Sequence, residues 1–509
     1  MFESAELGHK IDNATYARQV KKVRPELLDA QYDLLANKSF PVIVLVNGVD
    51  GAGKGETVNL LNEWLDPRHV RSVAFGAPND HELARAPMWR FWKVLPAKGK
   101  IGILFGNWYT DPINGRVQHR LSRTELPGAI ERLRHFERLL TDDGALLVKL
   151  WFHLSKKGMK KRLQELESNK LTRWRVTKGD WENFSHYDDY AKVSERVLRE
   201  TSTGDAPWVV IDGSDPNYRQ ITAAKTLLRA IQGRLNDARA HSLDARRAAR
   251  RRAGSREATT GVAPVFQTVD TSRILRDLPF TERLSKEKYE TRIVKVQGSL
   301  AKLTRTPKMP AHSVIVVFEG NDAAGKGGAI RRVTQALDAR QYDVIPIAAP
   351  TEEERAQPYL WRFWRHVPRR GRITVFDRSW YGRVLVERVE GFATQAAWSR
   401  AYAEINDFEE QLTEAGTVIV KVWLAVTKEE QLRRFKEREA TKFKQYKITP
   451  DDWRNRKKWD EYILAGSDMI DRTSTSFAPW HVIEANDKHL ARVRVIEAIT
   501  ARMDAAFNK

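Results

Sequence analysis

Cysteine is absent from this chain of 509 residues. The absence excludes disulfide bonds, thiol catalysis and the usual zinc sites that contain cysteine. Long apolar runs are missing too, since none approaches the roughly 18 residues of a membrane span. The opening stretch MFESAELGHKIDNATYARQV is polar and has no signal-peptide pattern. We therefore expect a cytoplasmic protein that does not cross a membrane.

Acidic residues are scarce relative to basic ones. The chain has 66 Asp and Glu against 87 Lys and Arg, which gives a formal net charge of +21. Such an excess is typical of proteins with a polyanionic partner, whether nucleic acid, an acidic membrane or a phosphate polymer. It is equally compatible with charge that only keeps a protein in solution. Charge alone does not choose among these partners.

The stretch VVFEGNDAAGKGGAIRRV, Val316 to Val333, has the form of a phosphate-binding loop. Gly320, Gly325 and Lys326 follow an apolar, β-branched run and precede a helix-forming segment, which is the context that such a loop needs. Backbone N–H groups and the helix N-terminus would bind a phosphate, and Lys326 would add a full charge. Gly327 stands where the usual loop has a magnesium-binding hydroxyl. A tight turn with a surface lysine is the simpler alternative.

The same pattern occurs earlier in the chain, in VLVNGVDGAGKGETVNLL, Val44 to Leu61. One offset of 272 residues aligns the two copies from the loop to the last strand without a gap. It pairs Gly48, Asp50, Gly53 and Lys54 with Gly320, Asp322, Gly325 and Lys326; the WRFW at Trp89 with that at Trp361; Trp108-Tyr109 with Trp380-Tyr381; and Asp180-Trp181 with Asp452-Trp453. Self-similarity of this extent indicates a tandem duplication.

Each copy alternates short apolar strands with longer helical patterns. In the second copy the strands are SVIVVFEG, DVIPIAAP, RITVFD, TVIVKVWLAV and WHVIEA. That order predicts an α/β fold, a doubly wound parallel sheet flanked by helices, with ligands at the carboxyl ends of the strands. We expect two domains, 1–235 and 273–509. Between them, 236–272 begins as an Arg/Ala helix former and becomes rich in Gly, Ser and Thr, which predicts an exposed basic linker.

Charged residues follow the predicted strand that ends at Asp377. In phosphate-loop enzymes an acid in that place holds magnesium. Arg378 and Arg383 could bind phosphate oxygens, and Glu387 could supplement the metal site. With no hydroxyl on the loop, we expect Asp322 and Asp377 to govern metal and phosphate together. A helix cap or a surface acid is the alternative for Asp377.

A third basic region, EEQLRRFKEREATKFKQYKITPDDWRNRKKW, follows the strand TVIVKVWLAV. Gln431, Arg434 and Arg438 share one face at helical spacing. A mobile basic helix there would act as a lid that closes arginines onto a bound phosphate. A solvent-exposed amphipathic helix fits the pattern equally well.

These segments carry a family resemblance. FEGNDAAGKGG, PTEEERAQPYLWRFWRHVPRRG, FDRSWYGRVLVERVEGF and TSTSFAPWHVIEANDKHLAR are similar to signature segments of the polyphosphate kinase 2 family. The resemblance covers nearly all of 274–509 and, more loosely, 14–235. The two-fold repeat resembles the fused class of that family, the polyphosphate:AMP phosphotransferases.

The resemblance implies two tandem thymidylate-kinase-like (P-loop-kinase-like) domains with a helical lid. It also implies Mg²⁺ and transfer of the terminal phosphoryl group of inorganic polyphosphate to AMP, giving ADP. The implied catalytic residues are Asp322, Lys326, Asp377, Arg378 and Glu387, of which Asp322, Asp377 and Glu387 bind the metal. The implied phosphate-binding residues are Gly320, Gly325, Gly327, Arg383, Arg438 and Lys444, the last two on the lid.

The first copy departs from that pattern. Asp377, Arg378, Arg383, Glu387 and Arg438 are matched by Phe105, Gly106, Asp111, Gly115 and Leu166. The loop residues Gly48, Asp50, Gly53 and Lys54 persist. We therefore expect a catalytically degenerate N-terminal domain that serves as a structural partner or as a polyphosphate-binding surface.

Three other functions remain open from the sequence. They are a polyphosphate-dependent kinase with ADP as acceptor, an ATP-dependent nucleotide kinase, and a nucleic-acid-binding protein with phosphate loops. No RNA- or DNA-binding motif is present, which argues against nucleic acid as a partner. The halves are expected to pack as an internal pseudo-dimer, and a further homo-oligomer is possible. The preferred acceptor and the direction favoured in the cell are not fixed by the sequence.

Overall fold

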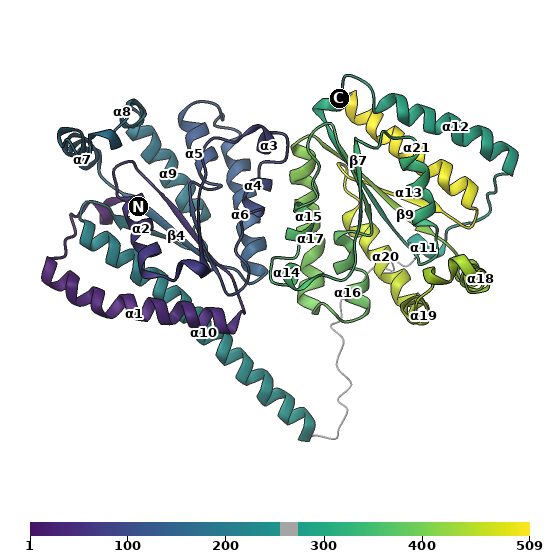
Figure 1. Cartoon of the computed structure of the whole chain (residues 1–509), viewed down its shortest axis with the longest axis horizontal. Helices are drawn as coiled ribbons and strands as arrows, with labels where there is room; N and C mark the ends of the chain where they lie inside the picture. The colour runs from purple at the N-terminus through teal and green to yellow at the C-terminus, as the bar shows by residue number, and fades with distance from the viewer. Residues whose placement is uncertain (255–272, 509) are drawn as a thin grey trace. The chain divides into compact units, whose positions relative to one another are not determined.

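The computed structural model describes residues 1–254 and 273–508. It contains two five-stranded sheets, one in each half of the chain (Figure 1). The strands of the first are β1 (Val42–Gly48), β2 (Val70–Ala74), β3 (Ile101–Phe105), β4 (Leu146–His153) and β5 (Trp208–Asp212). Those of the second are β6 (Ser313–Gly320), β7 (Tyr342–Pro346), β8 (Ile373–Asp377), β9 (Thr417–Ala425) and β10 (Trp480–Glu484).

Helices connect the strands in both halves. The first half has α1 (Asn13–Asn37), α2 (Lys54–Trp64), α3 (Asp80–Leu83), α4 (Trp89–Trp92), α5 (Thr110–Val117), α6 (Leu126–Asp142), α7 (Lys156–Ser168), α8 (Lys178–Ser185), α9 (Tyr187–Thr201) and α10 (Pro216–Gly254). The second has α11 (Arg273–Arg276), α12 (Lys286–Leu303), α13 (Lys326–Thr334), α14 (Glu352–Arg355), α15 (Trp361–Trp364), α16 (Val386–Val389), α17 (Gln395–Glu414), α18 (Lys428–Ala440), α19 (Pro450–Lys457), α20 (Trp459–Thr473) and α21 (Lys488–Phe507). Six short 3₁₀ turns complete the described chain: Glu3–Glu6, Pro67–His69, Arg173–Arg175, Met309–Ala311, Trp380–Arg383 and Lys442–Lys447.

Both sheets are parallel and have the same strand order, read from opposite edges. The orders are β2-β3-β1-β4-β5 and β10-β9-β6-β8-β7. The strand that precedes the glycine-rich loop is central in each, paired on one side to β3 or β8 and on the other to β4 or β9. The chain therefore leaves the central strand at the point where strand order reverses, which is where open α/β sheets bind ligands.

Helices cover both faces of each sheet. In the first half α1, α2 and α10 pack on one face through aliphatic side chains such as Leu27, Leu61 and Leu227. Figure 1 shows α1 and α10 running side by side. On the other face Trp92, Trp108 and Phe136 form edge-to-face ring contacts. The expectation of an α/β fold with parallel, helix-flanked sheets in tandem is confirmed.

A buried polar network repeats in the two halves. Lys421 Nζ donates to Glu409 Oε2 at 2.7 Å and to the Thr473 carbonyl at 2.6 Å, and Glu409 Oε1 accepts from Trp380 and Tyr381. The matched residues Lys149, Glu137, Thr201, Trp108 and Tyr109 make the same contacts. Every charged group in the network is paired, as a buried charge requires. The repeated Trp-Tyr pair in the sequence therefore belongs to the core.

The described residues group into two compact units. Within the described chain, one contains 1–78, 91–254 and 351–359, and the other 79–90, 273–350 and 360–508. Helix α10 continues to Gly254, into the stretch expected to be a linker. Residues 255–272 of that stretch lie outside the described chain. Among the described helices, none is long and apolar enough to cross a membrane.

Candidate active site

The phosphate-type loop of the second half starts at Gly320, the last residue of β6. Gly320 has φ +135°, and a Cβ there would overlap the carbonyl of Leu424 on the neighbouring strand β9. Gly325 has φ +107° and immediately precedes α13. Strand packing thus requires a glycine at position 320, whether or not this residue also helps to bind phosphate.

Lys326 begins α13 and turns back along the loop. Its Nζ donates to the carbonyls of Gly320 at 2.7 Å and Asn321 at 3.2 Å. Burial lowers the pKa of Lys326, and the carboxylate of Asp322 opposes that shift. The ammonium is therefore held inside the loop, where a phosphate would replace carbonyl oxygens as its partner.

Asp322 occupies the middle of the loop and links it to two other elements. Its Oδ1 accepts from Arg378 Nη2 at 3.2 Å, and its Oδ2 accepts from Asn455 Nδ2, on α19, at 2.9 Å. The expected proximity of Asp322, Lys326 and Arg378 is therefore present. Asn455 was not singled out from the sequence, although Asn183 occupies its matched position and would have signalled it.

Arg378 has an unusual backbone. Its φ is +65°, in the left-handed region that costs a residue with a Cβ roughly 1–2 kcal/mol. Although burial opposes it, the carboxylates of Asp322, Glu319 and Asp377 raise the pKa of Arg378. The cost of this backbone conformation, at a strand end among carboxylates, indicates that the arginine side chain has a function here.

An open cleft of about 760 Å³ extends from the loop. Seven lysine or arginine side chains and four aspartates line it: Lys326, Arg331, Arg332, Arg378, Arg438, Arg454 and Arg492, with Asp322, Asp377, Asp451 and Asp452. Asp377 and Arg438 therefore line the cleft beside the loop, as expected. Arg331, Arg332, Arg454 and Arg492 were not predicted, although the Arg-Arg pair directly after the loop was a visible signal. The positive excess suits a polyanionic ligand.

Helix α18 is hydrogen-bonded to the loop. Arg434 was expected to close onto a bound phosphate as part of a lid, and it contacts the loop backbone instead. Arg434 is 3% exposed. Its Nη1 donates to the carbonyls of Ala323 and Ala324, both at 3.0 Å, and its Nη2 donates to that of Ala485 at 2.6 Å. Gln431 Nε2 donates to the Asp322 carbonyl at 3.1 Å. Arg434 thus supports the loop from behind, and Arg438, one turn further on, faces the cleft. The side chain of Lys444 lies outside the described residues.

Arg383 and Glu387 pair with each other near the site. Arg383 Nε donates to Glu387 Oε2 at 2.7 Å. Neither residue is among the described side chains that line the cleft. The structure therefore brings Asp322, Lys326, Asp377, Arg378 and Arg438 together around one space and leaves Arg383 and Glu387 as a neighbouring ion pair.

Glu319 is a further ionisable residue beside the loop that sequence reasoning missed. It precedes Gly320, is 5% exposed, and its Oε1 accepts from Ser379 Oγ at 2.8 Å. Burial raises the pKa of Glu319, against the influence of Lys326. In the first half Asn47 matches Glu319 and Asn107 matches Ser379, so the pair carries no charge. Asn107 Nδ2 donates to Asn47 Oδ1 at 2.6 Å.

The first-half loop has a different arrangement. Lys54 Nζ donates to the carbonyls of Gly48 at 2.6 Å and Val49 at 3.1 Å, and it also reaches Asp50 Oδ1 at 3.3 Å. Asp50 Oδ2 accepts from Asn183 Nδ2 at 2.9 Å. Gly106, which matches Arg378, has φ +63° without the cost that a Cβ would add. The first half thus keeps the loop, and the arginine beside it is absent.

The chain is similar to known proteins in both of its halves. The family model described as "Polyphosphate kinase 2 (PPK2)" matches residues 10–239 and 283–509. A protein of Pseudomonas aeruginosa named "Polyphosphate:AMP phosphotransferase" is 52% identical over 509 residues, which covers all of both chains. A protein of the same name from Acinetobacter johnsonii is 38% identical over 508 residues, which covers 97% of this chain and 99% of that one.

A solved structure has the same architecture. A crystal structure from Pseudomonas aeruginosa, described as polyphosphate kinase 2, superposes with a TM-score of 0.89 at 51% identity and covers 100% of both chains. The similarity thus extends over the whole duplicated chain.

Proposed function

The chain belongs to the polyphosphate kinase 2 family, and we propose that it transfers the terminal phosphoryl group of inorganic polyphosphate to AMP, giving ADP. The observation that carries the proposal is the cleft of the second half, where Lys326, Asp322, Asp377 and Arg378 meet beside the loop. The full-length likeness to proteins named for this reaction supports it.

The reaction needs little acid–base chemistry. A phosphate oxygen of AMP, already ionised near neutral pH, forms a bond to the terminal phosphorus as the bond from that phosphorus to its bridging oxygen breaks. The leaving chain is shortened by one phosphate and keeps the electron pair of the broken bond. The barrier therefore comes from repulsion between two polyanions and from in-line alignment.

The residues of the cleft address both parts of that barrier. Lys326 and Arg378 bind oxygens of the phosphoryl group in transfer, and loss of such an arginine costs about 10³-fold or more in rate. Arg331, Arg332 and Arg438 hold the polyphosphate chain along the cleft. Arg434 keeps the loop carbonyls fixed, so that the loop is shaped before the substrate arrives.

Asp322 and Asp377 fit magnesium in their donor chemistry. Mg²⁺ is commonly held by one or two carboxylates together with water and substrate phosphates. Within 1–254 and 273–508 no set of three or more His, Asp or Glu side chains is gathered for a metal, and Glu387, unlike Asp322 and Asp377, does not line the cleft. We assign the ion to Asp322 and Asp377, and when bound it neutralises charge on the phosphates.

The decisive experiment incubates the purified chain with AMP, magnesium and polyphosphate and resolves the nucleotides. We expect ADP to form without ATP in the mixture. If AMP stays unchanged with polyphosphate and becomes ADP with ATP, the ATP-dependent kinase is correct. If ADP is converted to ATP and AMP is not used, the acceptor is ADP. Polyphosphate that fails to displace bound RNA would favour the nucleic-acid alternative.

A further inference from the structure

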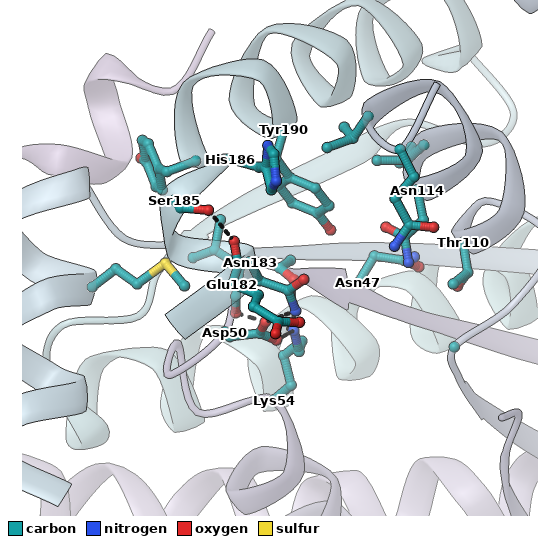
Figure 2. A pocket seen from close by; sticks show the side chains of 18 of the residues that line it. Asn47, Asp50, Lys54, Thr110, Asn114, Glu182, Asn183, Ser185, His186 and Tyr190 are labelled. Atoms are coloured by element: carbon teal, nitrogen blue, oxygen red, sulfur yellow. Dashed lines mark hydrogen bonds and ion pairs between the residues drawn. The ribbon is translucent and has the colours of Figure 1, made fainter. Parts of the chain in front are cut away.

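A pocket of about 390 Å³ lies beside the loop of the first half (Figure 2). It falls within the range of small-molecule sites. Figure 2 shows Asp50, Lys54 and Asn183 together at one part of its wall, with Asn47 and Asn114 at another. The half that has lost its catalytic residues thus has a well-formed cavity.

The second half has the matched cavity, and it is much smaller, at about 80 Å³. Arg378 lines the smaller one, and Gly106 takes its place in the larger. Val386 is matched by Asn114, and the indole of Trp459 is matched by the phenol of Tyr187. The first-half pocket has therefore lost a guanidinium and gained an amide.

The polar groups of the pocket suit a base and a sugar. Side-chain amides such as Asn47 and Asn114 pair with the hydrogen-bonding edges of nucleobases. Aromatic side chains such as Tyr190 and His186 offer faces for a flat ring. The carboxylate of Asp50 can accept from a ribose hydroxyl and repels a phosphate.

The pocket has few cationic side chains that could bind a phosphate. Among the described residues that line it, Lys54 is the one lysine or arginine. Its ammonium already has three acceptors, the carbonyls of Gly48 and Val49 and the carboxylate of Asp50. The hydrogen bonds of the Lys326 ammonium go to two carbonyls, whereas Lys54 is also paired with the Asp50 carboxylate at 3.3 Å. A phosphate in the first-half pocket would therefore face a carboxylate that already neutralises the one ammonium lining it.

The helix start next to the loop is filled by the protein's own side chains. Glu56, in the first turn of α2, accepts from Arg175 Nη2 at 2.9 Å and from Arg162 Nη2 at 3.4 Å, and it also pairs with Arg219. Although burial opposes it, these arginines lower the pKa of Glu56. The guanidinium of Arg219 lies directly on Gly53.

The matched position in the second half is open. Gly328 stands there and lines the large cleft. In the first turn of α2 the first half thus has a carboxylate paired with three arginines, where the second half has a glycine that lines the cleft. Helix starts of this kind are where phosphate-type loops bind anions.

We propose that the first half binds an uncharged purine nucleoside in this pocket and that Glu56 excludes phosphate from its loop. The inference goes beyond the proposed reaction and does not depend on it. It also replaces the earlier expectation of a polyphosphate-binding surface with a different ligand class.

The test measures binding of adenosine and of guanosine to the full chain by titration calorimetry. Asn114→Trp fills the first pocket, and Val386→Trp is the matched control in the second half. We expect one of the nucleosides to bind, with affinity at least 10-fold weaker in Asn114→Trp and retained in Val386→Trp. Asn114→Ala, which adds no bulk, serves as a second variant if the tryptophan prevents folding, and should weaken binding several-fold. Absence of binding by both nucleosides overturns the proposal, as does binding lost only in Val386→Trp.

The exclusion of phosphate is tested with tripolyphosphate. We expect Glu56→Gly, which copies Gly328, to add one tripolyphosphate site per chain relative to wild type. Glu56→Gln removes the charge at similar size and should give the same gain if the glycine variant does not fold. If wild type already binds tripolyphosphate at the first loop, with binding weakened by Lys54→Ala, or if neither Glu56 variant gains a site, the role assigned to Glu56 is wrong.

Discussion

Lys421 Nζ and Glu409 Oε2 lie 2.7 Å apart in the core of the second half, and both side chains are 0% exposed. Burial lowers the pKa of Lys421 and Glu409 raises it again, so that each charge depends on the other. The same pair, Lys149 and Glu137, occurs in the first half at 2.7 Å. Removing one member of such a pair leaves the other charge buried without its partner.

The first prediction concerns that pair. Glu409→Ala leaves the ammonium of Lys421 buried without a partner, which costs about 3–5 kcal/mol. We expect a large fall in thermal stability, measured by melting in circular dichroism, and a similar fall for Glu137→Ala. The double variant Glu409→Leu with Lys421→Met should recover most of the loss. A change of less than about 1 kcal/mol in Glu409→Ala would contradict this reading.

The second prediction uses the left-handed backbone of Arg378. Arg378→Gly relieves roughly 1–2 kcal/mol of strain and adds about 0.5–1 kcal/mol of chain entropy cost. Folding stability should therefore stay within about 1 kcal/mol of wild type, while AMP phosphorylation falls about 10³-fold. The reverse change, Gly106→Arg, should destabilise, because a Cβ there would lie 2.8 Å from the Phe75 carbonyl. A well-folded, active Arg378→Gly would remove this residue from the mechanism.

The third prediction separates the two loops. Lys326→Ala and Asp377→Asn should abolish turnover, since both residues line the catalytic cleft. Lys54→Ala should retain most activity, because its surroundings include Phe105 and Gly106 in place of an acid and an arginine. Steady-state AMP phosphorylation by purified variants, each checked by thermal melting, measures the difference. Equal loss in folded Lys54→Ala and Lys326→Ala would mean that the first half takes part in catalysis.

The fourth prediction distinguishes two arginines one helical turn apart. Arg434→Ala leaves the carbonyls of Ala323 and Ala324 without their donor, so that both melting temperature and turnover should fall. Arg438→Ala should lower turnover and polyphosphate binding at an unchanged melting temperature. Melting curves and KM for polyphosphate on the same samples provide the test. A drop in stability for Arg438→Ala alone would reverse the two assignments.

The fifth prediction concerns acid pH. Although burial opposes it, hydrogen bonds from Arg433 and Arg434 lower the pKa of Glu430 from 4.5 to about 2. Because the folded state holds the lower value, the stabilisation is present above about pH 4.5 and is lost as the pH falls towards 2. The melting temperature of wild type should therefore exceed that of Glu430→Gln near pH 6, and the gap should close by about pH 2. A gap that is constant with pH would exclude this role.

The pattern of the sequence predicts the fold well because its signals are local and repeated. Apolar strands alternating with helices indicate the parallel sheet, and the constant offset indicates two copies. The proximity of Asp322, Lys326 and Arg378 also follows, since strand ends meet at one edge of the sheet. The internal pseudo-dimer and the cytoplasmic location stay predictions.

Other features of the site depend on contacts between distant segments. Arg434 and Arg438 are equivalent in pattern, and only packing shows that one holds the loop and the other faces the cleft. Glu319 reads as one more residue near the end of a strand, and its burial beside Lys326 follows from how the Lys326 side chain turns back along the loop. The cluster around Glu56 joins α2, α7, the turn Arg173–Arg175 and α10, which no short motif connects.

The close approach of β4 to the first loop affects how a phosphate-loop motif in a sequence should be interpreted. A Cβ at Gly48 would overlap the carbonyl of Phe152, as one at Gly320 would overlap that of Leu424. The sheet alone therefore demands the first glycine of the motif, whether or not a phosphate ever binds beside it. A genome survey that counts phosphate-loop signatures therefore relies, at this position, on a glycine that the packing of parallel strands requires with or without a kinase centre.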